Sequence, residues 1–385
     1  MRRESHAELP GAPDPWALSE MPAFRSRPPY LMTEMIAAEP ALAERLMHRL
    51  ARDEAVDRVA ALVRQARAGH SEIIVTGAGT SEHAAMGIAE LLNEEAGGSG
   101  GFASALPPLE VLRRMPRAGL LIAVSHEGGT QMTNEALTAM RDAKVPTALI
   151  TTSDRSPAAQ IADSIIRTEE QDQSWCHTVG YLSPLIAGMA LAARLAGKPL
   201  DAQAIRAVLD VTADARAAAS VAAGLVGVDR LVVAGAGVDY VSARELALKV
   251  SEGARLPASA IELETVMHGH LAAATRWTGI VVVLSGRIAS AKPVERARRL
   301  LSAARALSMP AAAILTDSLA DEIERADTPA GRMVLPHVDR VSGVAGSLIG
   351  SATALQLLGE RLARARGVDP DTLGREDPAQ AAAHR

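Results

Sequence analysis

Short apolar runs, each followed by a helical pattern, organise the first half of the chain. The runs lie at 73–75, 120–124 and 146–151, and none shows the polar alternation of a half-exposed strand. Runs of this kind are typical of parallel strands that helices bury on both faces. A longer apolar segment at 180–196 has helical spacing and stops before Gly197, a common residue after a helix. The pattern predicts an α/β fold with a parallel sheet.

The second half of the chain repeats this pattern. Three segments recur in the same order, at offsets of 158, 160 and 164 residues: 73–92 with 231–250, 120–125 with 280–285, and 145–154 with 309–318. Recurrence in one order favours a duplicated α/β domain, and a length of 385 residues suits two domains.

The predicted boundaries follow from the spaces between these segments. We expect a first domain at 29–200, which includes N-terminal helices, and a second at 201–366. A proline-rich flexible arm at 1–28 precedes them, and a polar tail at 367–385 follows. Pro40 suits the first turn of a helix, so we expect one helix to end at Glu39 and another to begin there.

Composition excludes several classes of protein. The net charge is −5 and aromatic residues make up 2%, so no basic surface with interleaved aromatics indicates a nucleic-acid binder. Cys176 is the only cysteine, which excludes an internal disulfide and a multi-cysteine zinc site and suits a reducing cytosol. The N-terminus lacks the apolar core of a secretory signal, and the apolar stretch 185–196 is too short for a bilayer. We expect a soluble, cytoplasmic protein.

Two loops after predicted strands carry candidate anion-binding groups. Glycines, hydroxyls and free backbone N–H groups at the start of a helix can bind a phosphate without a lysine. Taken singly, each loop could also be an ordinary turn between a strand and a helix. The first lacks the third glycine of a dinucleotide fingerprint, and neither is a P-loop. The first loop offers Gly79, Thr80 and Ser81, and the second offers Ser125, His126, Gly128, Gly129 and Thr130.

The order of these motifs resembles the SIS (sugar isomerase) superfamily. It is Ala78-Gly-Thr-Ser, Ser125-His-Glu-Gly-Gly-Thr, Ala247-Leu-Lys-Val-Ser-Glu and Met267-His-Gly. The similarity is greatest to the isomerase half of glucosamine-6-phosphate synthase and to aminosugar-phosphate isomerase/deaminases, and it covers roughly 30–366. The resemblance implies two flavodoxin-like αβα three-layer domains and a homodimer. It also implies a small phosphosugar ligand, without cofactor or metal.

The resemblance also implies roles for single residues. Ser81, Ser125 and Thr130 match phosphate-binding hydroxyls. Glu252 matches the glutamate that moves the proton between C1 and C2, and His268 matches the histidine that assists ring opening. Lys249, three residues before Glu252, lies on the same helix face and would serve as a catalytic partner.

Each of these assignments has a structural alternative. Lys249 and Glu252 could form a surface ion pair, and His268 could be a loop histidine bonded to backbone. Ser174 and Thr178 could cap the long helix or touch the sugar, and we expect both roles. Cys176 is interpreted as a buried structural thiol because the sequence offers it no activating base.

The chain departs from the family pattern at three points. Glu127 lies within the second loop, where a carboxylate repels phosphate unless it points away or pairs with an arginine. No lysine follows Lys292, although related enzymes often close a C-terminal lysine over the substrate. Position 2 is arginine rather than the cysteine of a glutaminase domain, so we expect no glutamine-fed amination.

The predicted function is that of an aldose–ketose isomerase or isomerase/deaminase acting on a hexose or aminohexose 6-phosphate. A fructosamine-6-phosphate-type deglycase is a close variant. A non-catalytic phosphosugar sensor and a protein for unphosphorylated sugars remain as alternatives, the latter because of Glu127.

Overall fold

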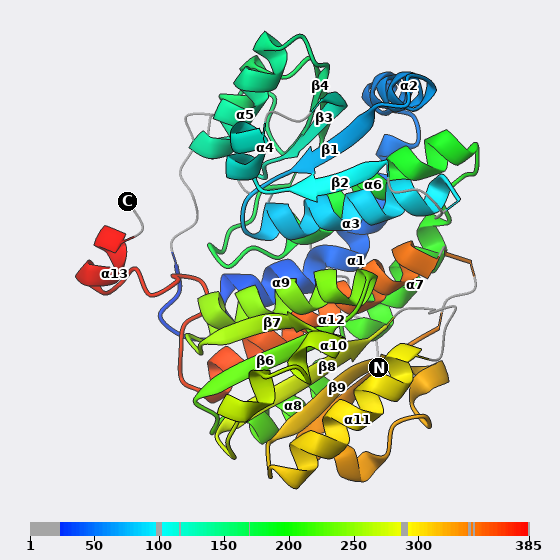
Figure 1. The fold of residues 1–385 in the computed structure, drawn as a ribbon. Helices are drawn as coiled ribbons and strands as arrows, with labels where there is room; N and C mark the ends of the chain where they lie inside the picture. The colour runs from blue at the N-terminus through cyan, green and yellow to red at the C-terminus, as the bar shows by residue number, and fades with distance from the viewer. Residues whose placement is uncertain are drawn as a thin grey trace. The chain divides into compact units, whose positions relative to one another are not determined.

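The computed structural model describes residues 24–97, 102–114, 117–168, 170–285, 292–337, 340–341 and 343–383. Contacts within the chain divide it into two compact units (Figure 1). The first contains Glu34–Gln173 and Thr178–Arg206, and the second contains Phe24–Thr33, Ser174–His177 and the chain from Ala207 onward. The expected N-terminal arm lies outside the described residues except for 24–28.

The first unit is built on a five-stranded parallel sheet of order β2-β1-β3-β4-β5. The chain moves outward from β1 to one edge and then returns to build the other edge from β3. The strand order therefore reverses between β1 and β3, whose neighbouring carboxyl ends are the usual ligand position in such sheets. The strands are β1 (Glu72–Thr76), β2 (Ala103–Leu106), β3 (Ala118–Val124), β4 (Thr147–Thr151) and β5 (Ser164–Arg167).

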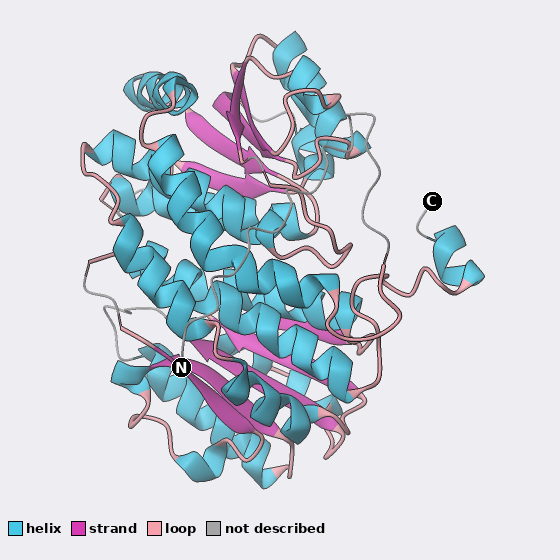
Figure 2. Cartoon of the chain, turned by 180° about the vertical axis from the view of Figure 1, so that it is seen from behind, coloured by secondary structure: helices cyan, strands magenta, loops and turns pink. Residues whose placement is uncertain are grey.

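Helices cover both faces of this sheet (Figure 2). One face packs its alternate apolar side chains against two helices, and the other packs against three. The first pair is α4 (Pro108–Arg114) and α5 (Gln131–Asp142), and the second group is α2 (Glu54–Ala68), α3 (Thr80–Glu95) and α6 (Val179–Ala196). A short turn of 3-10 helix, η1 (Ala158–Gln160), joins β4 to β5.

The second unit has a parallel sheet of order β10-β9-β8-β6-β7. Read from β7, this is the strand order of the first unit. Its reversal point lies between β6 and β8. The strands are β6 (Arg230–Gly235), β7 (Ala258–Glu262), β8 (Thr278–Leu284), β9 (Ala311–Thr316) and β10 (Gly331–Leu335). The prediction of an α/β fold with parallel sheets is confirmed for both units.

The helices of the second unit divide between the faces in the same way. On one side lie α10 (Leu263–Val266) and α11 (Lys292–Ala306), and on the other α8 (Ala215–Leu225), α9 (Val238–Gly253) and α12 (Gly343–Ala365). The remaining elements are α1 (Leu31–Leu50), α7 (Ala202–Thr212), α13 (Pro378–Ala383), η2 (His270–Ala273), η3 (Asp317–Leu319) and η4 (Arg325–Asp327).

Two helix boundaries differ from expectation. Pro40 lies inside α1, so the predicted break at Glu39 is wrong. The proline removes one helical hydrogen bond, a cost that the buried surroundings of this helix tolerate. The break comes instead at Asp53, whose carboxylate accepts from the N–H of Ala55 and caps α2.

Helix α6 is long and apolar enough to cross a membrane by length and composition, and it alone among the described helices passes that test. The expectation that this stretch is too short does not hold, because the helix has 18 residues. It is nevertheless 72% buried by the rest of the chain, as a core helix is.

The segment expected to be a polar tail is partly built into the second unit. Asp371 is fully buried, and its carboxylate accepts hydrogen bonds from the N–H groups of Leu31 and Met32, both at 2.8 Å. These amides open helix α1, where unpaired donors and the helix dipole favour an anion. The carbonyl of Asp371 also accepts from the N–H of Trp175 at 3.1 Å. One residue thus joins three distant stretches of the chain.

We expect Asp371→Ala to lower the free energy of unfolding by about 1–3 kcal/mol, because it leaves buried amides unpaired. Asp377→Ala is the matched control, since Asp377 caps the exposed and short α13 through Ala379. Urea denaturation of both variants measures the difference. Equal stability of the two would contradict the proposed anchoring.

Candidate functional site

The turn after the first strand has the same geometry in both units. Gly79 has φ 60° and ψ −129°, and Gly237 has φ 58° and ψ −129°. A Cβ on Gly77 would lie 2.5 Å from the carbonyl oxygen of Ser81, and one on Gly235 would lie 2.4 Å from that of Asp239. Glycine is therefore required at equivalent positions. Because each residue comes four positions after its glycine in turns of equal geometry, Asp239 is the counterpart of Ser81.

In the second unit this position is filled by a carboxylate of the chain itself. Asp239 Oδ1 accepts from the backbone N–H of Ser285 at 3.0 Å and from its hydroxyl at 2.5 Å. Both residues are buried, and Asp239 lies in the first turn of α9. The carboxylate thus binds the residue after β8 from the first turn of α9, where the helix dipole favours a negative charge.

In the first unit the corresponding serine has no such partner. Ser125 follows β3 as Ser285 follows β8, and it is only 2% exposed. Its hydroxyl has no hydrogen-bond partner among the described residues. A buried hydroxyl without a partner is costly and calls for a ligand or a bound water. Where the second unit has the carboxylate of Asp239, the first unit has the hydroxyl of Ser81.

Backbone amides surround the same place. Within the described residues, the N–H groups of Gly79, Gly128 and Gly129 have no acceptor. Gly128 has φ 72°, and a Cβ there would lie 2.1 Å from the hydroxyl oxygen of Ser156, so only glycine fits. Thr130, at the N-terminus of α5, is exposed. Thr80 and Ser81 open α3 and are buried. The loops therefore bring unpaired glycine amides and several hydroxyl groups together at two helix N-termini.

Glu127 is drawn to one side of this loop. Its carboxylate accepts a hydrogen bond from the side-chain amide of Gln171 at 3.0 Å. Gln171 lies within 2.9 Å of the hydroxyl of Thr152, which follows β4. The side-chain amide of Gln171 thus binds the carboxylate of Glu127, whose presence in the second loop the sequence did not explain.

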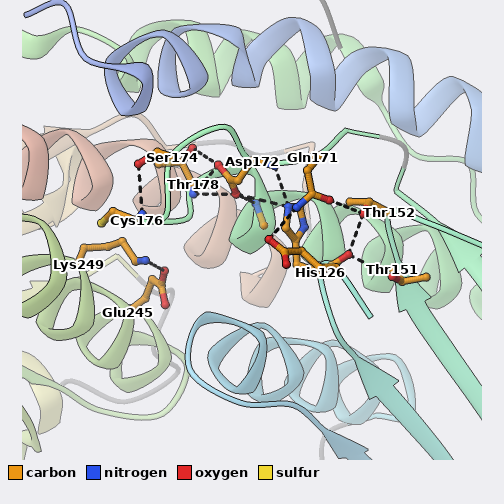
Figure 3. Close-up of polar contacts among 12 residues, drawn as sticks. His126, Thr151, Thr152, Gln171, Asp172, Ser174, Cys176, Thr178, Glu245 and Lys249 are labelled. Atoms are coloured by element: carbon orange, nitrogen blue, oxygen red, sulfur yellow. Dashed lines mark hydrogen bonds and ion pairs between the residues drawn. The ribbon is translucent and has the colours of Figure 1, made fainter. Parts of the chain in front are cut away.

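His126 is turned into the interior of the first unit (Figure 3). Its Nε2 accepts from the backbone N–H of Asp172 at 2.9 Å, and its carbonyl accepts from the hydroxyl groups of Thr151 and Thr152. Burial lowers the pKa of His126, although the negative charges of Asp172 and Glu127 oppose this. The imidazole is used to hold the segment after β5 in place.

The carboxylate of Asp172 caps the long helix α6. It accepts from the N–H groups of Thr178 and Gly180 and from the Thr178 hydroxyl at 3.1 Å. Ser174, in the second unit, accepts from the N–H of Cys176 at 3.2 Å. Ser174 and Thr178 therefore stabilise their own loop, and contact with a sugar remains a prediction for both.

Lys249 and Glu252 form an ion pair at the end of α9. Lys249 Nζ lies 2.6 Å from Glu252 Oε2 and 3.7 Å from Glu245 Oε1. The lysine side chain is 0% exposed, so the alternative of a surface pair is wrong. Burial by itself would lower the pKa of Lys249, but the negative charges of Glu252 and Glu245 and the hydrogen bond to Glu252 raise it above its ordinary value. The ammonium is permanently charged at neutral pH.

Sequence reasoning missed the third member of this cluster. Cys176 Sγ lies 3.8 Å from Glu252 Oε2, and the thiol is buried. The two residues are 76 positions apart, and no spacing rule connects a loop before one helix with the end of another.

His268 lies elsewhere on the second unit. Its side chain is 69% exposed, and Nε2 lies 3.0 Å from Glu264 Oε1. Arg296 contacts the same carboxylate at 2.8 Å. Within the described part of the chain, no contact joins His268 to Glu252. The searched residues also hold no group of three His, Cys, Asp or Glu side chains placed for a metal ion.

The buried imidazole generates a pH prediction. Because the folded chain has a lowered pKa at His126, the unfolded chain binds a proton that the folded chain does not as pH falls below about 6.5. The free energy of unfolding should therefore decrease as pH falls from 7.5 to 5.5, about one unit either side of 6.5. The decrease should be less steep in the His126→Gln variant. Urea denaturation at several pH values measures the slope, with His268→Gln as the control that removes an exposed imidazole. A wild-type slope in His126→Gln would contradict the assignment.

Comparisons with known proteins agree with this architecture. A family model for the SIS domain matches residues 68–194. Among solved structures, the C-terminal domain of glucosamine-fructose-6-phosphate aminotransferase from Francisella tularensis is similar with a TM-score of 0.74 and 19% identity, covering 91% of this chain and 99% of that one. Tagatose-6-phosphate ketose/aldose isomerase from Escherichia coli is similar with a TM-score of 0.68 and 19% identity, covering 89% and 95%.

A third similar structure is glucosamine-6-phosphate deaminase from Thermotoga maritima, with a TM-score of 0.62, 18% identity and coverage of 87% and 96%. No curated protein sequence matches the chain. The chain therefore contains a SIS domain at residues 68–194 and shares its fold with solved phosphosugar isomerase structures.

Proposed function

We propose that the chain is a phosphosugar isomerase or isomerase/deaminase that acts on a hexose or aminohexose 6-phosphate. The phosphate binds between β1 and β3 of the first unit, at Ser81, Ser125 and the amides of the second loop. A carboxylate of the second unit, Glu252, then moves a proton between C1 and C2 of the sugar.

One observation carries the phosphate assignment. Equivalent serines end β3 and β8, and the serine of the second unit binds the carboxylate of Asp239. In the first unit Ser81 replaces this aspartate, and the hydroxyl of Ser125 is buried without a partner in the described chain. An external anion in the first unit would make the bonds that Asp239 makes in the second. A phosphate monoester, with several acceptor oxygens, suits a seat of hydroxyls and helix N-termini.

The end of α9 supplies what proton transfer needs. Glu252 Oε2 is held by the Lys249 ammonium, whereas Oε1 has no partner among the described residues and the side chain is 26% exposed. The paired oxygen fixes the carboxylate, and the other is available as a base. The buried ammonium stabilises the negative charge of an enediolate that forms nearby.

The proposed isomerisation needs no reagent besides the sugar phosphate, and the deamination needs only water in addition. In isomerisation, Glu252 takes the proton from C2 of an open-chain aldose and returns it to C1, while the hydroxyl proton of C2 moves to the oxygen on C1. With a 2-amino sugar, the same transfer gives a C2 imine, and water then adds and releases ammonia, leaving the ketose phosphate. His268, which lies apart from Glu252 within one chain, would assist ring opening in the active site of the second subunit of the proposed homodimer.

The finer description of the architecture is part of the same proposal. Both units have one strand order, the same first turn and helices α3 and α9 of 16 residues each. These features support two duplicated flavodoxin-like αβα SIS domains. The proposal also includes a homodimer and a cytoplasmic location.

One observation favours a second candidate, a phosphosugar sensor without catalysis. His268 is exposed and paired with Glu264 rather than with the Lys249–Glu252 cluster. A protein that only bound the phosphate would not need that histidine near the sugar.

The phosphate seat is tested by Ser125→Ala against Ser285→Ala. We expect Ser125→Ala to weaken binding of glucosamine 6-phosphate about tenfold or more, because it removes a hydrogen bond to a charged group, and to leave thermal stability unchanged or raised. Ser285→Ala should lower thermal stability by removing the partner of Asp239, with little effect on binding. Calorimetric titration and thermal melts of both variants give the four values. A loss of affinity in Ser285→Ala alone would move the site to the second unit.

Glu252→Gln separates the enzyme from the sensor. The amide keeps the size of the side chain but cannot accept the proton, so turnover should fall at least 10²-fold while ligand affinity stays within a few-fold of wild type. Proton NMR in D₂O, with a panel of hexose and aminohexose 6-phosphates, detects exchange at C1 or C2 and any ammonia. A wild-type chain that binds a phosphosugar but exchanges no proton would favour the sensor.

A further inference from the structure

We propose that Cys176 is a positioning residue, whose thiol holds the carboxylate of Glu252 and determines which of its oxygens carries the proton. The proposal rests on the function proposed above and deepens it. It assigns a role to the one cysteine of the chain, which the phosphate seat and the ion pair leave unexplained.

Two donors converge on one oxygen of Glu252. Lys249 Nζ lies 2.6 Å from Oε2, and Cys176 Sγ lies 3.8 Å from the same atom. A carboxylate oxygen accepts in more than one direction, so both groups can donate to it. The ammonium of Lys249, on its long side chain, fixes the distance to the Glu252 carboxylate but restricts the rotation of that carboxylate very little. A second donor from another direction fixes the rotation and leaves Oε1 as the oxygen that meets a substrate.

The thiol itself has little freedom to move. The N–H of Cys176 donates to the hydroxyl of Ser174, and the preceding residue, Trp175, donates its N–H to the carbonyl of Asp371. The indole of Trp175 contacts the ring of Phe24 at 4.6 Å and the guanidinium of Arg375 at 4.3 Å between centres. Aromatic and cation–π contacts on this ring hold the backbone next to the cysteine.

The sulfur of Cys176 packs against the end of α9. Gly253 has no side chain, and a Cβ there would lie 3.4 Å from Cys176 Sγ and 3.4 Å from Pro370. The charged groups known to face Glu252 in the second unit are Lys249 and, through that lysine, Glu245. The sulfur therefore lies buried beside an ion pair. At this place a weak hydrogen-bond donor can orient the carboxylate, and this role does not require a reactive thiolate.

A thiol differs from the alternatives for this place. A second ammonium would neutralise the carboxylate, and an aliphatic side chain would leave its rotation unrestrained. An S–H group donates weakly, so it orients the acceptor without greatly weakening it as a base. This physical difference gives the role two independent readouts.

The first readout does not depend on activity. Because the chain has one cysteine, its infrared S–H stretching band reports on Cys176 alone. We expect this band to shift in Glu252→Gln, since an amide oxygen accepts less strongly than a carboxylate, and to stay unchanged in Glu264→Gln, the same substitution at an exposed pair. An unchanged band in Glu252→Gln, or no S–H band in the wild type, overturns the proposal.

The second readout is kinetic. Cys176→Ala should lower kcat about tenfold with KM unchanged and increase the exchange of the migrating proton with solvent, because small displacements of a catalytic group are costly. Cys176→Ser keeps a donor and should restore most of kcat and of the proton transfer. Far-ultraviolet melts establish the temperature at which both variants are folded. Equal kinetics for alanine, serine and wild type would overturn the proposal, whereas absence of turnover in the wild type would overturn the proposed function and leave the infrared test valid.

Discussion

A negative charge at the N-terminus of the first helix after the first strand is the interaction on which the difference between the two units depends. The turn geometry dictated by Gly77 and Gly235 exposes amides at that helix end, and the following strand places a serine beside it. These donors need an anion. The second unit provides one from its own sequence with Asp239, and the first unit does not. A difference of one side chain, Asp239 in place of Ser81, thus separates a turn that binds its own carboxylate from the turn proposed above to bind a phosphate.

Much of this could be read from the sequence, and the missing part has a physical cause. The central strands β1, β3, β4, β6, β8 and β9 are continuous apolar runs because helices bury both of their faces. The edge strands escaped prediction because they are short and partly exposed, as the mixed burial of Ala103–Leu106 and Ala258–Glu262 illustrates. These edge strands form because they pair with a neighbouring strand, and their own composition does not predict that pairing.

The site was predictable where it follows strand ends and helix spacing, and unpredictable where it depends on distant residues. Lys249 and Glu252 share a face by spacing alone, yet their burial requires the tertiary structure. Cys176 comes from a loop held by Asp371, close to the C-terminus, so nothing local indicated its partner. Asp239 did carry a signal. Aligning the two repeats places it opposite Ser81, and a carboxylate in place of a hydroxyl in an anion-binding turn could have been interpreted as an internal ligand.

The filled turn also explains why catalysis would be assigned to the second unit and binding to the first. Helix α9 begins at Val238, next to the aspartate that binds Ser285, and ends at Gly253, just after Glu252. An internal anion keeps this helix fixed whether or not a ligand is present, which a catalytic carboxylate requires for constant geometry. The turn of the first unit keeps an unpaired buried hydroxyl at some cost in stability, and the proposed binding of an anion would recover that cost. Two units with one strand order can divide the two proposed demands, since the catalytic carboxylate would need a rigid helix and the phosphate an unfilled turn.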